Sequence, residues 1–342
     1  MTQRLDTLQL FRGLAAIGVV LYHAANATNA FMAEPIPQAL QVVLRHGYLG
    51  VDFFFVLSGF IILNSHQGDA RNLAMARSYF LKRLIRIFPP YLPVSIVLLV
   101  SYAALPTLSA GTRGEISLLS SLLLLPSAYP PALTIAWTLL HEMLFYVVFL
   151  AFYVGSVAFS VVMFLWLAAI VLANATHGIE TLAPLFKVLL DPINLEFMMG
   201  MGCAWLWRRL PGGRRAGHLA AAGGVALFLV LVPMVPIEWR FLFGIPFALI
   251  VLGGVTLDRT GSILVPRRLI LLGDASYSIY LIHYPLLSLT SRMMRLLGGY
   301  SSWWLTLSAG VVLSLVFGIL YHRIVEIPSL RFLRRRFLSP AR

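Results

Sequence analysis

Long apolar runs constrain this chain more than any other feature of its sequence. About ten of them follow one another, each about 20 residues long, which matches a hydrocarbon core of about 30 Å. The sequence therefore predicts an all-α polytopic membrane protein with about ten transmembrane helices. The expected spans are residues 8–27, 47–65, 84–104, 134–153, 157–174, 190–208, 217–235, 239–257, 270–290 and 302–322.

The chain has too few polar residues to cover a separate soluble domain. Charged residues make up 11% of it and hydrophobic residues 59%, whereas soluble domains carry about 25% charged residues. We expect a single integral-membrane domain over residues 1–342, with no appended soluble domain. The weaker run 116–126 is short and ends at Pro126, so we expect an interfacial or re-entrant segment there. Cys203 is the single cysteine, which excludes an intramolecular disulfide.

The basic residues predict how the chain is oriented in the membrane. The formal net charge is +13, which in a soluble protein would suggest a nucleic-acid partner. With the N-terminus inside, however, most of the 26 lysines and arginines fall in inner segments, as the positive-inside rule requires. We therefore expect cytoplasmic N- and C-termini, a lipid bilayer around the helices and no nucleic-acid partner.

Arg12 and His23 are ionisable residues within the first apolar run. Their separation of eleven residues places them within about 20° of one helix face and about 16 Å apart along its axis. Ionisable residues inside a membrane are costly and are read as functional first. The alternative is that Arg12 reaches the lipid headgroups and His23 is a hydrogen-bonded packing residue. The run also fits a cleaved signal peptide ending near residues 25–27, whose removal would take both residues with it.

The predicted orientation places other polar residues near the level of His23. His23 lies in the outer half of the membrane, near Asn26. Residues of other helices that fall in the outer half or near mid-depth are Asp52, Glu142, Tyr280 and His283. This agreement in depth favours one site that draws on several helices.

The chemistry expected at this level is proton transfer. A neutral histidine can take the proton of a hydroxyl group as its oxygen attacks a carbonyl carbon. A carboxylate at the other ring nitrogen would fix the tautomer and stabilise the imidazolium, and Asp52 and Glu142 are both candidates for that role. A metal site is the rival interpretation, but no two candidate ligands have the close spacing typical of one, so we expect no metal.

Arg83 and Arg86 form a second group, at the inner end of the third span. They are three residues apart and therefore lie on one helix face. Paired guanidinium groups bind phosphates well, which together with Arg12 suggests a phosphate-bearing donor that enters from the cytoplasm. The alternative is that these arginines contact lipid headgroups and set the orientation of the chain.

These residues resemble the motifs of the membrane-bound acyltransferase-3 family. The run from Arg12 to His23 is similar to the Arg-x10-His first helix of that family. The segments that resemble its other motifs, in the same order, are Gly50–Phe60, Arg83–Arg86, Trp137–Tyr146 and Ser276–Pro285. The resemblance covers essentially the whole chain and looks closest to the stand-alone branch that acetylates exopolysaccharide.

The resemblance implies an O-acyltransferase of the bacterial inner membrane. Such enzymes move an acyl group, usually acetyl, from cytoplasmic acetyl-CoA to a hydroxyl group of a carbohydrate. It also implies that His23 is catalytic, that Arg12 is required and that Arg83 and Arg86 hold the phosphates of CoA. Glu142 matches a family residue whose role is less settled. The remaining candidates for the substrate site are Asn26, Tyr146, Tyr280 and His283.

Several alternatives stay open from the sequence. The first is a transporter or flippase of a lipid-linked sugar or acylated polyol, using the same charges as a proton relay. The second is transfer through an acetyl-histidine intermediate. His283 has a structural interpretation too, since its ring would cap backbone freed by Pro285. The histidines expected to be non-catalytic are His141, His177, His218 and His322.

Overall fold

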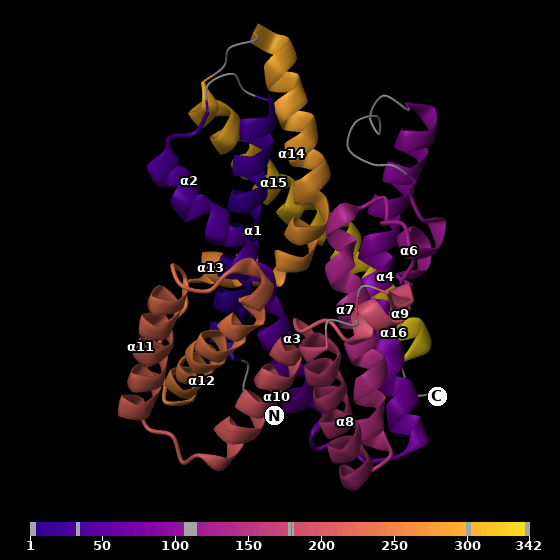
Figure 1. The fold of residues 1–342 in the computed structure, drawn as a ribbon, viewed down its shortest axis with the longest axis vertical. Coiled ribbons are helices and arrows are strands. Elements are labelled where there is room, and N and C mark those ends of the chain that lie inside the picture. The colour runs from indigo at the N-terminus through magenta and orange to yellow at the C-terminus, as the bar shows by residue number, and fades with distance from the viewer. Residues whose placement is uncertain are drawn as a thin grey trace. The chain divides into compact units, whose positions relative to one another are not determined.

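The structure is a computed structural model that describes residues 5–31, 35–105, 115–176, 179, 181–298 and 302–338. Helices are the only regular secondary structure of these residues (Figure 1). The α-helices are α1 (Asp6–Phe31), α2 (Gln38–Leu44), α3 (Gly50–His66), α4 (Leu73–Ala104), α6 (Leu118–Leu123), α7 (Trp137–Phe149), α8 (Ser156–Ala175), α9 (Pro184–Leu189), α10 (Asn194–Arg209), α11 (Arg214–Leu231), α12 (Gly244–Arg259), α13 (Arg267–Asp274), α14 (Ser276–Gly298), α15 (Trp303–Tyr321) and α16 (Ile327–Phe337). The shorter helical turns are η1 (Arg45–Leu49), η2 (Thr134–Ala136), η3 (Leu150–Tyr153), η4 (Ile237–Phe243) and the π-helical turn η5 (His322–Glu326).

The prediction of an all-α polytopic membrane protein is confirmed. Within the described residues, 8 helices are long and apolar enough to cross a membrane. The two other predicted spans, 190–208 and 270–290, also contain helices. Of these, α10 is only 16 residues long, and α14 carries serine, histidine, tyrosine and arginine residues that lower its hydropathy. The run 116–126 contains the six-residue helix α6, which is too short to span.

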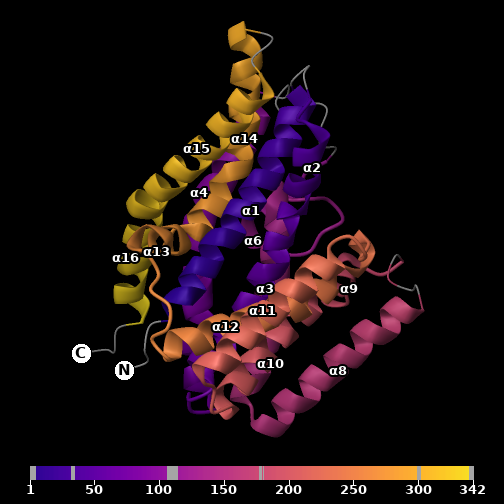
Figure 2. The ribbon, with the colours of Figure 1, turned by 90° about the vertical axis from the view of Figure 1, so that its left-hand side faces the viewer.

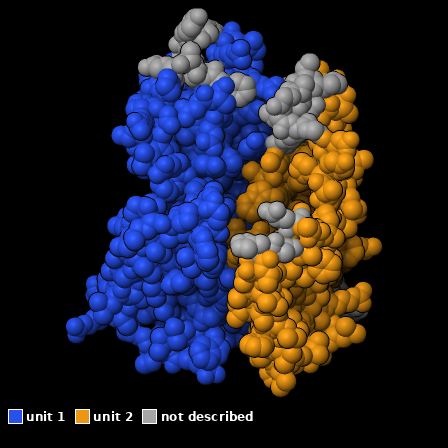
Figure 3. Space-filling model, in the orientation of Figure 1, with its two compact units in different colours: residues 1–67, 195–320 blue, residues 68–194, 321–342 orange. Residues whose placement is uncertain are grey.

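The chain divides into two compact units, each made from two separate stretches of sequence. The first unit comprises residues 1–67 and 195–320, and the second comprises residues 68–194 and 321–342 (Figure 3). Because the stretches alternate along the sequence, no single cut in the chain separates the two units.

Helix α1 is the central element of the first unit. It packs against α13, α14, α3 and η1 (Figures 1 and 2). A cluster of buried small and branched residues joins α1 to α13 and α14: Ala16, Val20, Ala275 and Ile279. Such close packing positions the polar residues of α1 and α14 with little freedom.

Helices α3 and α10 approach each other at two glycines. A Cβ atom built on Gly200 would lie 2.0 Å from the carbonyl oxygen of Val56, and one on Gly59 would lie 2.1 Å from that of Phe197. Only glycine fits at such a contact, which is a common device for packing membrane helices. In the same unit α11 and α12 lie side by side (Figures 1 and 2).

Helix α4 organises the second unit. Asn72 caps its N-terminus, where the side-chain Oδ1 accepts a hydrogen bond from the Met75 N–H at 2.9 Å. The helix packs against α7, α6 and α16. Tyr79 of α4 is fully buried among the aromatic rings of Tyr146, Phe149 and Tyr153. This cluster fixes the face of α4 from which Arg83 and Arg86 project.

Candidate active site

His23 lies on α1 of the first unit, where it contacts aromatic rings. Its ring centroid is 5.2 Å from that of His283 and 5.2 Å from that of Tyr284, both on α14. The neighbouring Tyr22 ring is 4.9 Å away. The His23 side chain makes no hydrogen bond with any described residue. Its ring nitrogens are therefore not bound to polar groups of the described residues.

His283 is fully buried beside it. Its Nδ1 lies 2.6 Å from the carbonyl oxygen of Tyr280. The carbonyl that Pro285 leaves without a helical N–H donor is that of Leu281, so the ring does not cap the group we expected. Nε2 of His283 is buried and has no hydrogen-bond partner among the described residues.

Asp52 is bound to an arginine. Its carboxylate accepts hydrogen bonds from Arg240 Nε at 2.9 Å and from Arg240 Nη2 at 2.5 Å. Asp52 is fully buried, and the Arg240 guanidinium also lies over the ring of Tyr48, 5.0 Å from its centroid. Within the described part of the chain, no hydrogen bond joins Asp52 to His23. The structure thus assigns this carboxylate to an ion pair.

Two further predicted residues lie along α1. Arg12 Nη1 donates a hydrogen bond to Gln9 Oε1 at 3.3 Å, one turn earlier on the helix. Asn26 is exposed, one turn beyond His23. Neither observation assigns a role to its residue, and Arg12 and Asn26 both remain candidates from the sequence.

In the second unit, Glu142 and Tyr146 of α7 are hydrogen-bonded to each other. The Tyr146 hydroxyl donates to Glu142 Oε1. The guanidinium of Arg83 lies 5.8 Å from the centroid of the Tyr146 ring and 5.7 Å from that of Tyr79. Such cation–π contacts help to hold a guanidinium group in place.

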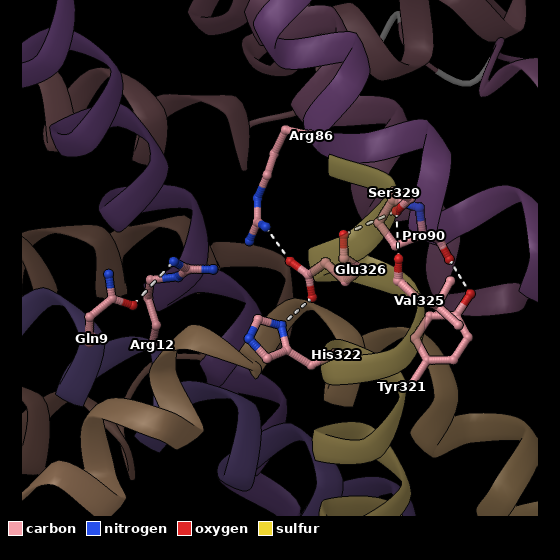
Figure 4. Close-up of polar contacts among 9 residues, drawn as sticks. All are labelled: Gln9, Arg12, Arg86, Pro90, Tyr321, His322, Val325, Glu326 and Ser329. Atoms are coloured by element: carbon pink, nitrogen blue, oxygen red, sulfur yellow. Dashed lines mark hydrogen bonds and ion pairs between the residues drawn. The ribbon is translucent and has the colours of Figure 1, made fainter. Parts of the chain in front are cut away.

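Arg86 is bound to the carboxylate of Glu326, which is not among the site residues predicted from the sequence. Its Nη1 donates to Glu326 Oε1, and Nδ1 of His322 lies 2.8 Å from Glu326 Oε2 (Figure 4). Glu326 is fully buried and lies in the π-helical turn η5. Turns of this kind are frequent at functional sites. His322, which we expected to be non-catalytic, is therefore part of the hydrogen-bonded group around Arg86.

A third arginine belongs to this group. Arg334 of α16 lies close enough to Arg83 and Arg86 to interact with their charges, and also with that of Glu326. Three guanidinium groups whose charges interact, with one buried carboxylate among them, favour an anionic ligand. Guanidinium groups of this kind bind phosphates well.

Metal-binding residues do not gather in the described ranges. No group of three or more histidine, cysteine, aspartate or glutamate residues there could hold a metal ion. His177 lies outside the described residues. The expectation that the protein uses no metal stays a prediction.

The residues that sequence reasoning missed are Arg240, Tyr284, His322 and Glu326. A local signal exists for the last two, because a histidine and a glutamate four residues apart lie on one helix face. The predicted tenth span ended at residue 322 and left Glu326 outside it. No local signal links Arg240 to Asp52, which is 188 residues away in the sequence.

Comparison with known proteins matches most of this sequence to one family. The sequence model of the acyltransferase-3 family, described as an acyltransferase domain, matches residues 5–323. Acyltransferase MdmB of Streptomyces mycarofaciens is 30% identical, over 97% of this chain and 93% of its own length. The exopolysaccharide production protein ExoZ of Rhizobium meliloti is 32% identical, over 93% of this chain and 96% of its own length.

A more distant relative is larger. The peptidoglycan O-acetyltransferase OatA of Listeria monocytogenes is 24% identical, over 83% of this chain but 50% of its own length. No solved structure matches the chain.

Proposed function

We propose a reaction for this chain from one premise: the chain belongs to the acyltransferase-3 family of membrane acyltransferases. The proposed reaction moves an acyl group, acetyl in the first instance, from acyl-CoA to a hydroxyl group of an exported or cell-surface carbohydrate. The names of two relatives support this acceptor class, since one is an exopolysaccharide production protein and another a peptidoglycan O-acetyltransferase. The proposed location is the bacterial inner membrane.

One observation carries the proposal. His23 lies in an apolar helix, its ring contacts the rings of Tyr22, His283 and Tyr284, and its side chain makes no hydrogen bond with a described residue. A structural histidine inside a membrane would satisfy its nitrogens with protein groups. An imidazole left without such partners suits a general base whose partners are the substrates.

The proposed mechanism is direct transfer. One ring nitrogen of His23 takes the proton of the acceptor hydroxyl while the hydroxyl oxygen forms a bond to the thioester carbonyl carbon. The carbon–sulfur bond then breaks, and the leaving thiolate takes the proton back from His23. An ester and free CoA are the products, and His23 returns to its neutral form.

The donor is proposed to bind through its phosphates. Arg83 and Arg86 of α4, with Arg334 of α16, provide the cationic groups. The distribution of basic residues in the sequence predicts that this end of α4 faces the cytoplasm, where acyl-CoA is available. Glu326 and the rings of Tyr79 and Tyr146 hold the arginines in position.

The proposal is tested with purified protein in proteoliposomes. Acetyl-CoA is added with a panel of bacterial exopolysaccharides, and ester formation is measured as acetate released from the polysaccharide by mild alkali. We expect at least one polysaccharide to gain ester-linked acetyl groups in proportion to the CoA released. Uptake of unmodified glycan or of a lipid-linked sugar, without release of CoA by folded protein, would contradict the proposal and favour transport.

A further inference from the structure

The two ring nitrogens of His283 are in different situations. Nδ1 lies 2.6 Å from the carbonyl oxygen of Tyr280. A carbonyl oxygen only accepts hydrogen bonds, so Nδ1 must carry the hydrogen. In a neutral imidazole the other nitrogen, Nε2, is then an acceptor with a lone pair. The backbone of α14 therefore selects the tautomer of His283.

This acceptor is left without a donor. Nε2 of His283 is buried, and none of the described residues gives it a hydrogen bond. Buried polar atoms are nearly always paired, and an exception calls for a functional explanation. The side chain as a whole is fully buried, so bulk water does not supply the missing donor.

The nearest ring that carries an N–H group is His23. The two ring centroids are 5.2 Å apart and the ring planes are inclined by 44°. At this separation, nitrogens on facing edges of the two rings can come within hydrogen-bond distance. No hydrogen bond joins the two rings, and the His23 ring makes none with any other described residue. Rotation about its Cβ–Cγ bond, a torsion with broad minima, can bring an N–H group toward His283.

We propose that His283 is the positioning residue for His23, and this inference rests on the proposed function, in which His23 is the base. An N–H group of His23 donates to Nε2 of His283. This hydrogen bond leaves the other nitrogen of His23 deprotonated and directed at the acceptor hydroxyl. His283 thus has the orienting role that a carboxylate has in hydrolase triads.

The proton balance of the reaction agrees with this role. Before transfer, His23 carries one hydrogen, on the nitrogen that faces His283. When its other nitrogen takes the hydroxyl proton, His23 becomes an imidazolium with both nitrogens protonated, and the bond to His283 persists. The leaving thiolate then accepts the transferred proton. His283 neither gains nor loses a proton at any point.

The ion pair of Asp52 strengthens the assignment. We expected Asp52 or Glu142 to orient His23, but the carboxylate of Asp52 is held at two points by Arg240. Nε2 of His283, by contrast, belongs to a ring that contacts His23 and has no hydrogen-bond partner among the described residues. A neutral acceptor also avoids placing an additional charge in an apolar surrounding, which would be costly.

Two substitutions at residue 283 separate this role from packing. In His283→Gln, the amide oxygen falls near the position of Nε2 and can accept the hydrogen bond from His23. In His283→Asn, the amide nitrogen falls near Nδ1 and can donate to Tyr280, but nothing replaces Nε2. Both are polar substitutions at the same buried site, so each serves as the folding control of the other.

We expect His283→Gln to keep kcat within about fivefold of wild type and His283→Asn to lose about 50-fold or more. KM for both substrates should change little in either variant. The kcat values are expressed per amount of folded protein, as determined by size-exclusion chromatography. Equal kcat values in the two variants would overturn the inference and leave a packing role. A raised KM for the carbohydrate at unchanged kcat would also overturn it and assign His283 to acceptor binding.

His23→Ala, measured alongside, distinguishes failure of this inference from failure of the proposed function. If His23→Ala is inactive and both His283 variants are as active as wild type, only the positioning role fails. If His23→Ala keeps wild-type activity, the assignment of the base fails and the positioning role fails with it.

Discussion

Asp52 and Arg240, 188 residues apart in the sequence, form an ion pair joined at two points. Asp52 is fully buried, and the side chain of Arg240 is 20% exposed. The pair links α3 to the turn η4 within the first unit. Because Arg240 binds both oxygens of this carboxylate, we expect Asp52 to stabilise the fold around the site rather than to orient His23.

We predict that breaking this pair destabilises the protein more than it slows the chemistry. Removing one partner of a buried pair leaves an uncompensated charge and costs about 3 kcal/mol or more. Asp52→Asn and Arg240→Gln should each lower the melting temperature in detergent. The double variant should lose less than the sum of the two single losses. Additive losses, or an inactive Asp52→Asn with unchanged melting temperature, would contradict this account.

Glu326 and Arg86 should act as one unit in donor binding. We expect Glu326→Gln to raise KM for acetyl-CoA about tenfold, because a charge-assisted hydrogen bond to Arg86 is lost. Arg86→Ala should have a similar effect. If the two residues act together, KM for acetyl-CoA in the double variant should equal that of Arg86→Ala alone. If they act independently, the two increases in KM should multiply. Initial rates at varied acetyl-CoA concentrations measure all three variants.

Arg83 of α4 should matter only for donors that carry phosphates. Arg83→Ala should raise KM for acetyl-CoA about tenfold but leave KM for S-acetyl-pantetheine, which lacks the nucleotide and its phosphates, unchanged. Arg77→Ala is the matched control, since Arg77 is an exposed residue of the same helix. An equal loss with both donors would show that Arg83 acts on something other than the phosphates.

The sequence predicted the helices well because each spanning run is a local property. The same reasoning placed His23 and His283 at one depth, and the structure brings their rings into contact. Depth follows from the position of a residue within its own helix. The residues that it contacts on other helices depend on how the helices pack, and no local sequence pattern predicts that packing. The sequence alone therefore does not link Arg240 to Asp52, although Asp52 is one of the predicted site residues.

The helix contact between α3 and α10 provides a test of the fold. A side chain at Gly200 would collide with the backbone of Val56, since even its Cβ atom would lie 2.0 Å from that carbonyl oxygen. We expect Gly200→Leu to abolish recovery of monodisperse protein in detergent. Gly202→Leu is the control, because a Cβ atom at Gly202, on the same helix, has nothing within 4 Å. Similar recovery of the two variants would mean that α3 and α10 do not pack in this way.

The position of Glu326 has a local pattern in the sequence. His322 and Glu326 are four residues apart at the end of the last apolar run, a spacing that places them on one helix face. A buried acidic residue at such a position predicts a polar contact, although not its partner. Arg86, 240 residues earlier, is identified as that partner only by the fold.

The most direct test of the central claim, that His23 is the base of an acyl transfer, is the rate of free-CoA release by purified protein in proteoliposomes. Wild type and His23→Gln are compared with acetyl-CoA, with and without an acceptor polysaccharide that wild type acetylates. We predict acceptor-dependent release by wild type and a loss of about 100-fold or more in the variant, because glutamine cannot take up a proton. Acceptor-dependent release at an undiminished rate by His23→Gln would contradict the claim.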